Sequence, residues 1–301
     1  MSGWDKLIEK VDDLIDRVNP LLPPRYEPID WKVTKAARWH RVGRFGSLYP
    51  VKNPHEIRLQ DLKGIDDQKL IVDKNIRQFV NSYPANNVLL TGSKGTGKSS
   101  LVKAMLVRYS KQGLRVIEVE KDDLHELQLI IDQIAPQPYR FIIYCDDLSF
   151  SAEEGGYKAL KVALDGSIAT CSENILIFAT SNRRHLLPEL MSENLETRYV
   201  GTEVHPGETT EEKISLSERF GLWVNFDSFD QDTYLRIVEH WIDLLSNGSI
   251  AFDESVSRLS LQWALERGSR SGRVAYHFSR DYIGSEMLNR GAKPRAKKTA
   301  K

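Results

Sequence analysis

One short stretch of the chain, from Gly92 to Ser99, has the residue types and spacing to hold a phosphate group and a metal ion. Gly92 is followed after four residues by Gly97, Lys98 and Ser99, and a further glycine stands at position 95. Glycines let the backbone curl so that successive N–H groups point at phosphate oxygens. In this pattern the lysine contacts the β- and γ-phosphates and the hydroxyl binds Mg²⁺. We therefore expect nucleotide contacts from Gly92, Ser93, Lys94, Gly95, Thr96, Gly97, Lys98, Ser99 and Ser100.

The sequence on both sides of this stretch supports the interpretation. The apolar run Asn87–Thr91 precedes it and is typical of a buried strand, and residues 100–109 have the apolar spacing of a helix. The N-terminus of that helix would face the same anion. A chance pair of loop glycines would lack both neighbours.

Two adjacent acids, Asp146 and Asp147, follow the apolar run Arg140–Cys145. At the carboxyl end of a neighbouring parallel strand they would point into the same crevice as the phosphate-binding loop. Asp146 would then hold the Mg²⁺ shell, and Asp147 would polarise the attacking water. Glu153 and Glu154 are rival candidates for the base. Strand ends also carry Asp as a turn former or helix cap, which is the structural alternative.

A third polar group ends the apolar run Asn174–Thr180. Asn182 would lie between the metal-binding strand and the phosphate-binding loop, where it could hydrogen-bond water and the γ-phosphate. Thr180 and Ser181 are its neighbours. An asparagine in an ordinary strand-to-loop turn is the structural alternative.

The elements that must position these groups form a regular pattern. Five short apolar runs are typical of strands buried on both faces of a parallel sheet, with helical stretches between the first four: Asn87–Thr91, Arg115–Glu120, Arg140–Cys145, Asn174–Thr180 and Gly221–Phe226. They predict an α/β fold, a doubly wound three-layer domain with the phosphate-binding loop after its first core strand. After Asp227 the pattern is helical only, over 231–246, 254–267 and 272–289, which predicts a small all-α domain.

The two ends of the chain differ from this core. Residues 3–18 predict an amphipathic helix, and residues 31–50 mix basic and aromatic side chains. Such an arm could bind nucleic acid, or pack on its own core or on a neighbouring subunit. Residues 290–301 carry six basic and no acidic side chains, as disordered, solubilising tails do, although such a tail can also bind nucleic acid. We expect an N-terminal helix and extension (1–55), a core (56–228), a helical lid (229–290) and a basic tail (291–301).

Composition excludes several classes of protein. The 301 residues have 41% hydrophobic content and 42 basic against 42 acidic side chains, as in an ordinary globular protein. No apolar run approaches the roughly 20 residues that cross a bilayer. We expect the N-terminus to form an amphipathic helix and not a signal peptide, and Cys145 and Cys171 lack metal-ligand spacing. We expect a cytoplasmic protein with no membrane contact and both cysteines reduced.

The order of phosphate-binding loop, paired acids, strand ending in Asn, arginine-bearing helix and helical lid resembles the AAA+ ATPases. The chain is most similar, over roughly residues 25–290, to a bacterial family known as domain of unknown function 815. The phrases that carry this resemblance are 64–69 (GIDDQK), 84–90 (PANNVLL), 146–150 (DDLSF), 179–186 (ATSNRRHL), 218–221 (ERFG) and 271–273 (SGR).

The resemblance implies further roles. The glycine loop and the paired acids correspond to the Walker A and Walker B motifs, and the segment 62–69, with Ile65, is similar to the one that flanks adenine. Arg219 matches the arginine finger that reaches a neighbour's γ-phosphate, with Arg198 as the alternative. Arg273 matches the sensor arginine of the lid, with Arg270 as the alternative. Residues 183–185 (RRH) either respond to nucleotide state or form a solvated turn.

The combination predicts a hydrolase that uses ATP and Mg²⁺ in a ring-like homo-oligomer with sites between subunits. It would couple hydrolysis to the remodelling or loading of a client, a protein or nucleic acid that the sequence does not identify. The alternative is a nucleotide-gated binding module with negligible turnover, which the Asp at position 147 favours because many such ATPases have Glu there. A small-molecule kinase shares only the phosphate-binding loop.

Overall fold

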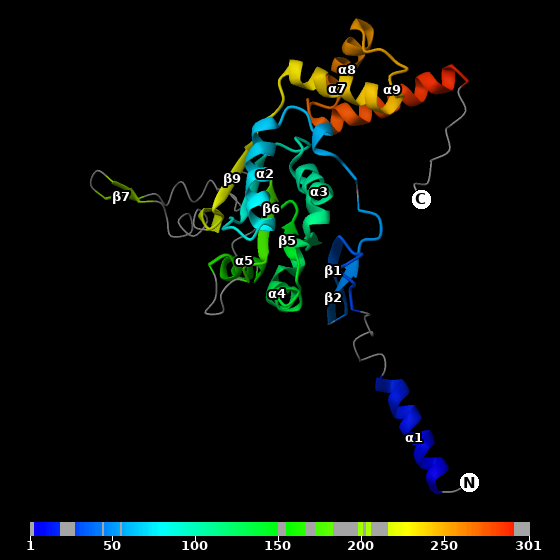
Figure 1. Ribbon diagram of the computed structural model, residues 1–301, viewed down its shortest axis with the longest axis vertical. Coiled ribbons are helices and arrows are strands. Elements are labelled where there is room, and N and C mark those ends of the chain that lie inside the picture. Colours follow the sequence, from blue (N-terminus) through cyan, green and yellow to red (C-terminus); the bar gives the residue numbers. More distant parts are fainter. Residues whose placement is uncertain are drawn as a thin grey trace.

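The computed structural model describes residues 3–18, 28–43, 45–54, 56–149, 155–165, 172–182, 198–200, 203–205 and 216–291. Within these residues, a layered core carries a group of three helices at one end, and helix α1 (Gly3–Val18) extends away from the core (Figure 1). Two short strands, β7 (Arg198–Val200) and β8 (Glu203–His205), pair with each other. None of the helices in these ranges is long and apolar enough to cross a bilayer.

The core is built on a seven-stranded sheet with the strand order β2-β1-β4-β5-β6-β3-β9. Its strands are β1 (Ala36–Val42), β2 (Phe45–Pro50), β3 (Val88–Gly92), β4 (Leu114–Glu118), β5 (Arg140–Cys145), β6 (Ile175–Ser181) and β9 (Leu222–Phe226). All neighbouring pairs are parallel except the hairpin of β1 and β2. The five predicted apolar runs all form strands, and the predicted α/β fold is confirmed.

Helices cover both faces of this sheet. Helices α2 (Asp66–Val80) and α3 (Lys98–Tyr109) pack on one face with Val88 and Leu90. Helices α4 (Leu127–Ile134) and α5 (Gly155–Asp165) pack on the other with Leu89. Successive strand residues point to opposite faces, so one apolar run supplies both cores. Three short 3₁₀ turns, η2 (Leu59–Asp61), η3 (Ser110–Gln112) and η4 (Lys121–Glu126), complete the connections.

The three C-terminal helices form a unit with its own apolar core, which we call the lid. They are α7 (Gln231–Ser246), α8 (Glu254–Glu266) and α9 (Gly272–Asn289). Each begins where a side-chain oxygen accepts a backbone N–H three residues on, from Asp230, Asp253 and Ser271 respectively. Such caps satisfy N–H groups that the first turn leaves unpaired.

Residues 36–50, which we expected in the N-terminal extension, contribute β1 and β2 to the core sheet, where β1 pairs with β4. Trp31 and Trp39 are buried, so the basic and aromatic stretch packs on its own core. The phosphate-binding loop therefore follows the third strand of the sheet in the sequence. Cys145 is buried at the end of β5, and burial raises the pKa of its thiol to about 12. Cys171 and the tail beyond residue 291 lie outside the described residues.

Candidate functional site

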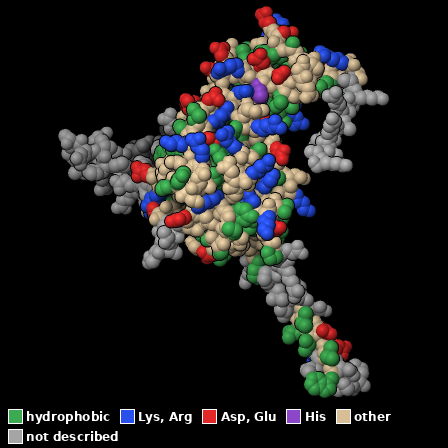
Figure 2. All heavy atoms as spheres, viewed as in Figure 1, with side chains coloured by type: hydrophobic (Ala, Val, Ile, Leu, Met, Phe, Trp, Pro, Cys, Tyr) green, Lys and Arg blue, Asp and Glu red, His purple; other side chains and the backbone are tan. Residues whose placement is uncertain are grey.

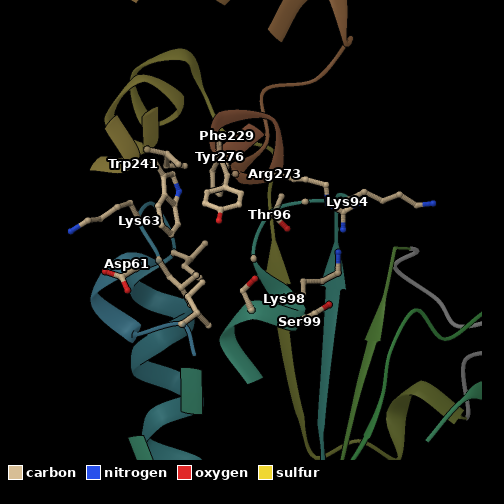
Figure 3. Close-up of a pocket in the computed structure, with 18 of the residues that line it drawn as sticks. Asp61, Lys63, Lys94, Thr96, Lys98, Ser99, Phe229, Trp241, Arg273 and Tyr276 are labelled. Carbon is tan, nitrogen blue, oxygen red and sulfur yellow. The ribbon is translucent and has the colours of Figure 1, made fainter. Parts of the chain in front are cut away.

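A cavity of about 670 Å³ lies between the core and the lid. Its size is in the range of small-molecule sites. Figure 3 shows Lys98 and Ser99 on the core side, and Trp241 and Tyr276 reaching in from the lid. Of the residues expected to contact a nucleotide, those that line the cavity are Ile65, Lys94, Gly95, Thr96, Gly97, Lys98, Ser99, Ser100, Asp146, Asp147, Asn182 and Arg273.

The phosphate-binding loop has a backbone that side chains would disrupt. Gly92, Gly95 and Gly97 have φ of 121°, 76° and 107°, values that glycine adopts far more easily than other residues. A Cβ on Gly92 would lie 2.0 Å from the carbonyl oxygen of Phe226 on the neighbouring strand β9. Gly97 is the N-cap of α3, so the N-terminus of this helix opens toward the cavity. Free N–H groups at a helix N-terminus favour an anion there.

Lys98 is held on the loop by its ammonium group. Its Nζ donates to the carbonyl oxygens of Gly92 (2.7 Å) and Ser93 (2.8 Å) and to Oδ1 of Asn182 (3.0 Å). Burial lowers the pKa of Lys98, and the attraction of Asp146 and Asp147 offsets this only in part. A phosphate group beside the ammonium would favour its charged form.

Asp146 and Ser99 lie side by side at the ends of β5 and the phosphate-binding loop. Ser99 Oγ donates to Asp146 Oδ1 at 2.8 Å, and the hydroxyls of Tyr144 (2.7 Å) and Thr180 (2.5 Å) donate to the same oxygen. Burial by itself would raise the pKa of Asp146, but the hydrogen bonds from Thr180, Tyr144 and Ser99 hold it below its ordinary value. The carboxylate is therefore ionised at neutral pH.

This pair of oxygens fits Mg²⁺, which binds hard oxygen ligands and commonly takes only one or two from the protein, with water and phosphate completing its shell. No group of three or more His, Cys, Asp or Glu side chains within the described ranges could hold a metal by itself. The metal would therefore depend on Ser99, Asp146 and a bound phosphate together.

Asp147 and Asn182 contact each other beside Lys98. The Asn182 amide Nδ2 donates to Asp147 Oδ1, and the Asp147 N–H donates to Thr180 Oγ1 at 2.8 Å. Asp147 has a φ of 53°, in the left-handed region that few residues adopt outside glycine, Asn and Asp. The geometry thus brings together both strand ends and the loop, as the sequence predicts. Glu153 and Glu154, the rival bases, lie outside the described residues.

The far end of the cavity is apolar and aromatic. Ile65 is buried before the first turn of α2, and a Cβ on Gly97 would lie 3.4 Å from its Cδ1. From the lid come Trp241 and Tyr276, whose rings meet edge to face with centroids 4.8 Å apart. We call this the base end of the cavity, because an apolar slot with aromatic rings suits a planar heterocycle.

Arg273 is the second residue of α9 and lies next to the phosphate-binding loop. Its backbone N–H donates to the carbonyl oxygen of Gly95 at 3.3 Å, and its side chain lines the cavity (Figure 3). The alternative, Arg270, lines a neighbouring hollow of about 430 Å³ instead.

Arg219 does not line this cavity. Its Nε lies 2.5 Å from Oδ1 of Asp165 at the end of α5. Arg198 lies in β7, but the structure does not describe its side chain. Residues 183–185 lie outside the described residues altogether. Of the two candidate fingers, the structure therefore places only the side chain of Arg219, and it places it outside the cavity of its own chain.

Sequence reasoning missed three residues of the site. Tyr144 lies inside an apolar run, so its sequence position is typical of a buried core residue, although its hydroxyl donates to Asp146. Burial and the charge of Asp146 raise the pKa of Tyr144, so it keeps the proton that it donates. Trp241 and Tyr276 lie within helical patterns, where an aromatic residue usually signals packing.

Comparison with known proteins supports the fold. Residues 32–286 match the family described as "Protein of unknown function (DUF815)". No curated protein matches the sequence. A solved structure of ORC1 from Aeropyrum pernix in complex with DNA has 15% identity and a TM-score of 0.53, covering 79% of this chain and 63% of that chain. A mutant of RuvB from Thermotoga maritima has 12% identity and a TM-score of 0.52, covering 79% of this chain and 68% of that chain. The chain thus spans about two thirds of the length of these structures, and at such identities the likeness shows the fold alone.

Proposed function

Since the chain belongs to the DUF815 family and has the fold of AAA+ P-loop NTPases, we propose that it binds ATP with Mg²⁺ between core and lid and hydrolyses it. Hydrolysis would drive lid and interface motion that remodels or loads a client.

The contact between Ser99 and Asp146 carries this proposal. It joins the hydroxyl of the phosphate-binding loop to a carboxylate from a strand two positions away in the sheet. If Asp146 were only a helix cap or a turn former at the end of its strand, nothing would require it to contact Ser99. A shared divalent cation that also contacts a phosphate accounts for the pair, and Lys98 lies close enough to contact the same phosphate.

Each residue then has a role that follows from its position. The loop N–H groups and the N-terminus of α3 would bind the phosphates, and Lys98 would exchange its carbonyl contacts for phosphate oxygens. Ser99 and Asp146 would hold Mg²⁺, which neutralises charge on the phosphates when bound. Asp147 would orient the attacking water and accept its proton, and Asn182 would fix the Asp147 carboxylate. Arg273 would contact the phosphates from the lid.

The base end of the cavity would receive adenine. Ile65 would contact one side of the ring from the core, and Trp241 and Tyr276 would contact it from the lid. Arg219 would act on the site of a neighbouring copy in a ring-like homo-oligomer, because its position away from its own cavity leaves it no role there.

A nucleotide-gated binding module with negligible turnover is the second candidate. The observation that favours it is the contact of Asn182 with Asp147, which occupies an oxygen that a general base needs. Asp is also one methylene shorter than Glu, so its reach toward a water on the γ-phosphate is less.

Asp147→Asn separates the two functions. The hydrolase proposal expects this variant to bind ATP as the wild type does and to release phosphate at least about 100-fold more slowly, as removal of a general base does. Calorimetry and a phosphate-release assay in Mg²⁺ measure the two properties. Asp122→Asn, at an exposed acid in η4, is the matched control and keeps both. Tight ATP binding with wild-type phosphate release no faster than in Lys98→Ala selects the binding module.

A further inference from the structure

Helix α1 carries a stripe of large apolar side chains that no described residue covers. Its members, each between 46% and 73% exposed, are Trp4, Ile8, Val11, Leu14 and Ile15. Figure 1 shows α1 standing apart from the core, and Figure 2 shows green hydrophobic side chains along it. Single exposed apolar residues are ordinary, but a continuous patch of them marks an interaction site.

The stripe has the spacing of helices that pack on one another. Trp4 and Val11 are seven residues apart, as are Ile8 and Ile15, and Leu14 follows Val11 by three. Such a seven-residue apolar repeat keeps its members on one face of a helix and is typical of helices that lie side by side. A helix of 16 residues is marginal in water unless its apolar face is packed. The stripe therefore indicates a helical partner.

The charged residues beside the stripe are separated by sign. With about 3.6 residues per turn, Lys10 and Arg17 lie on one flank of the stripe, and Asp12 lies on the other. All three side chains are exposed. By the same spacing, positions 5 and 16 of the Asp12 flank are also Asp in the sequence. One flank of α1 is thus basic and the other acidic.

A second copy of α1 fits both the stripe and its flanks. When two identical helices pack in parallel, the basic flank of one faces the acidic flank of the other, whereas antiparallel packing sets each flank against its own kind. Arg17 contacts Asp13 of its own helix at 2.9 Å. Because both side chains are exposed, this pair contributes little and leaves Arg17 able to face another copy.

An anionic lipid surface fits the same stripe less well. Residues 3–18 carry five acidic and three basic side chains. Helices that lie on membranes are instead rich in Lys and Arg on their polar face. The charge of α1 therefore favours the second copy as the partner.

We propose that α1 binds α1 of other copies of this chain through the apolar stripe, in parallel and in register, with the basic flank of one copy against the acidic flank of the next. A contact between two different flanks is heterologous, and when it is repeated around an axis it closes into a ring. Parallel helices also leave all cores at the same end of the bundle. This surface is separate from Arg219 and from the nucleotide site, so the inference stands without the proposed function.

Disulfide formation between single cysteines in the full chain tests the orientation, with Cys145→Ala and Cys171→Ala as the background. Parallel packing sets position 4 of one copy beside position 4 of the next, within the roughly 7 Å between Cα atoms that a disulfide can span. Antiparallel packing centred on position 11 separates the two positions by about 21 Å, because each residue of a helix rises about 1.5 Å. Under mild oxidation we expect Trp4→Cys and Val11→Cys to form covalent dimers at similar rates.

Glu9→Cys, on the exposed side of α1 away from the stripe, is the matched control. It should cross-link at least about tenfold more slowly than the other two, because only a docked pair raises the effective concentration of the two thiols. Cross-linking of Val11→Cys without Trp4→Cys means antiparallel packing and overturns the inference. Equal rates at all three positions, or no cross-linking at any, also overturn it, and capture of the chain by anionic lipid vesicles would then assign the stripe to a membrane.

Charge reversal tests the flanks independently. In the Trp4→Cys background, Lys10→Glu with Arg17→Glu makes both flanks acidic, and Asp5→Lys with Asp12→Lys makes both basic. Each pair of changes alone should slow cross-linking at least about fivefold, and an equal mixture of the two proteins should regain the parent rate, because unlike flanks face each other again. Recovery in the mixture also shows that both variants still form the helix. No loss in either variant, or no recovery in the mixture, contradicts the pairing of flanks.

Discussion

At the scale of single residues, Lys98 shows how the site is prepared before any nucleotide binds. Its ammonium donates to two loop carbonyls and to Asn182, which keeps it at the place where a β- or γ-phosphate would lie. A lysine that is already ordered loses little side-chain freedom on binding. Asp146 is prepared in the same way, by three hydroxyl donors.

Tyr144→Phe tests the donors on Asp146. Because the pKa of Asp146 is lowered in the folded protein, its contribution to stability is present above its unfolded pKa of about 3.9 and is lost as the pH falls through the lower folded value. Loss of one hydrogen bond to a carboxylate should cost about 1.5 kcal/mol at pH 7. Urea unfolding at pH 7 and pH 3 measures this. The cost should shrink at pH 3, and an equal cost at both pH values would contradict the assignment.

Arg273→Ala and Arg270→Ala test the choice between two lid arginines. Only Arg273 lines the cavity, so its loss should weaken ATP binding by about tenfold or more, as expected for a charged contact to phosphate. Arg270→Ala should change the dissociation constant less than threefold. Isothermal titration of both variants measures the difference, and the reverse ranking would transfer the sensor role to Arg270.

The sequence predicted much of the site but not all of it. Glycine spacing and acids at strand ends indicated Gly92, Ser99 and Asp146, because these residue types have few other reasons to recur in that order. The role of Tyr144 could not be predicted, since a tyrosine inside an apolar run looks like a core residue until the structure shows that its hydroxyl donates to Asp146. The side chains of Asp61 in η2 and His240 in the lid lie 3.6 Å apart (Oδ1 to Nε2). No local pattern indicates such a contact, because the two residues are far apart in the sequence.

At the scale of elements, the lid and the core meet through glycines as well as side chains. Gly64→Ala should move α7 off the core, because its Cβ would lie 2.4 Å from Thr233 Cγ2. Gly248→Ala is matched to it: φ is positive at both positions, 75° and 72°, but the nearest atom to its Cβ is 3.7 Å away. Both variants should lose about 1 kcal/mol of stability from backbone strain.

In addition to this loss of stability, only Gly64→Ala should weaken nucleotide binding. The dissociation constants of a fluorescent ATP analogue for the two variants measure this. Equal affinity in both would show that the lid does not need this contact.

The helices and strands were predictable where local signals agree. The helical pattern of the sequence predicted α7 and α9 to the residue, and in the structure each of them begins at a side-chain cap. The hairpin β1–β2 was not predicted, because a stretch rich in basic side chains is untypical of a buried strand. In β1, however, the side chains of Ala37 and Trp39 are buried, whereas those of Arg38 and His40 are exposed. Its pairing with β4 is a contact across about 80 residues of sequence, and such partners are set by packing and not by local propensity.

At the scale of the whole molecule, the position of Arg219 suggests a site completed by a second copy. Its contact with Asp165 holds it away from its own cavity. If Arg219 acts on a neighbour, Arg219→Ala should bind ATP normally but hydrolyse it poorly, by about 1,000-fold for a full arginine finger. Turnover per wild-type chain should also rise with protein concentration.

Mixing two inactive variants tests this more sharply. In assemblies of Arg219→Ala with Lys98→Ala, some sites combine an intact loop from one chain with an intact Arg219 from another. Phosphate release should therefore be partly restored in the mixture, whereas each variant alone stays inactive. No restoration, in a mixture shown by sedimentation to co-assemble, would assign Arg219 a role within its own chain.

The central claim is that the cavity between core and lid binds and hydrolyses Mg-ATP. Phosphate release by the wild type and Lys98→Ala, with Mg²⁺ and with a chelator in its place, tests it most directly. We predict Mg²⁺-dependent release by the wild type and none above background for Lys98→Ala, because an alanine leaves the phosphates without their ammonium partner. Equal release by the two proteins would contradict the claim.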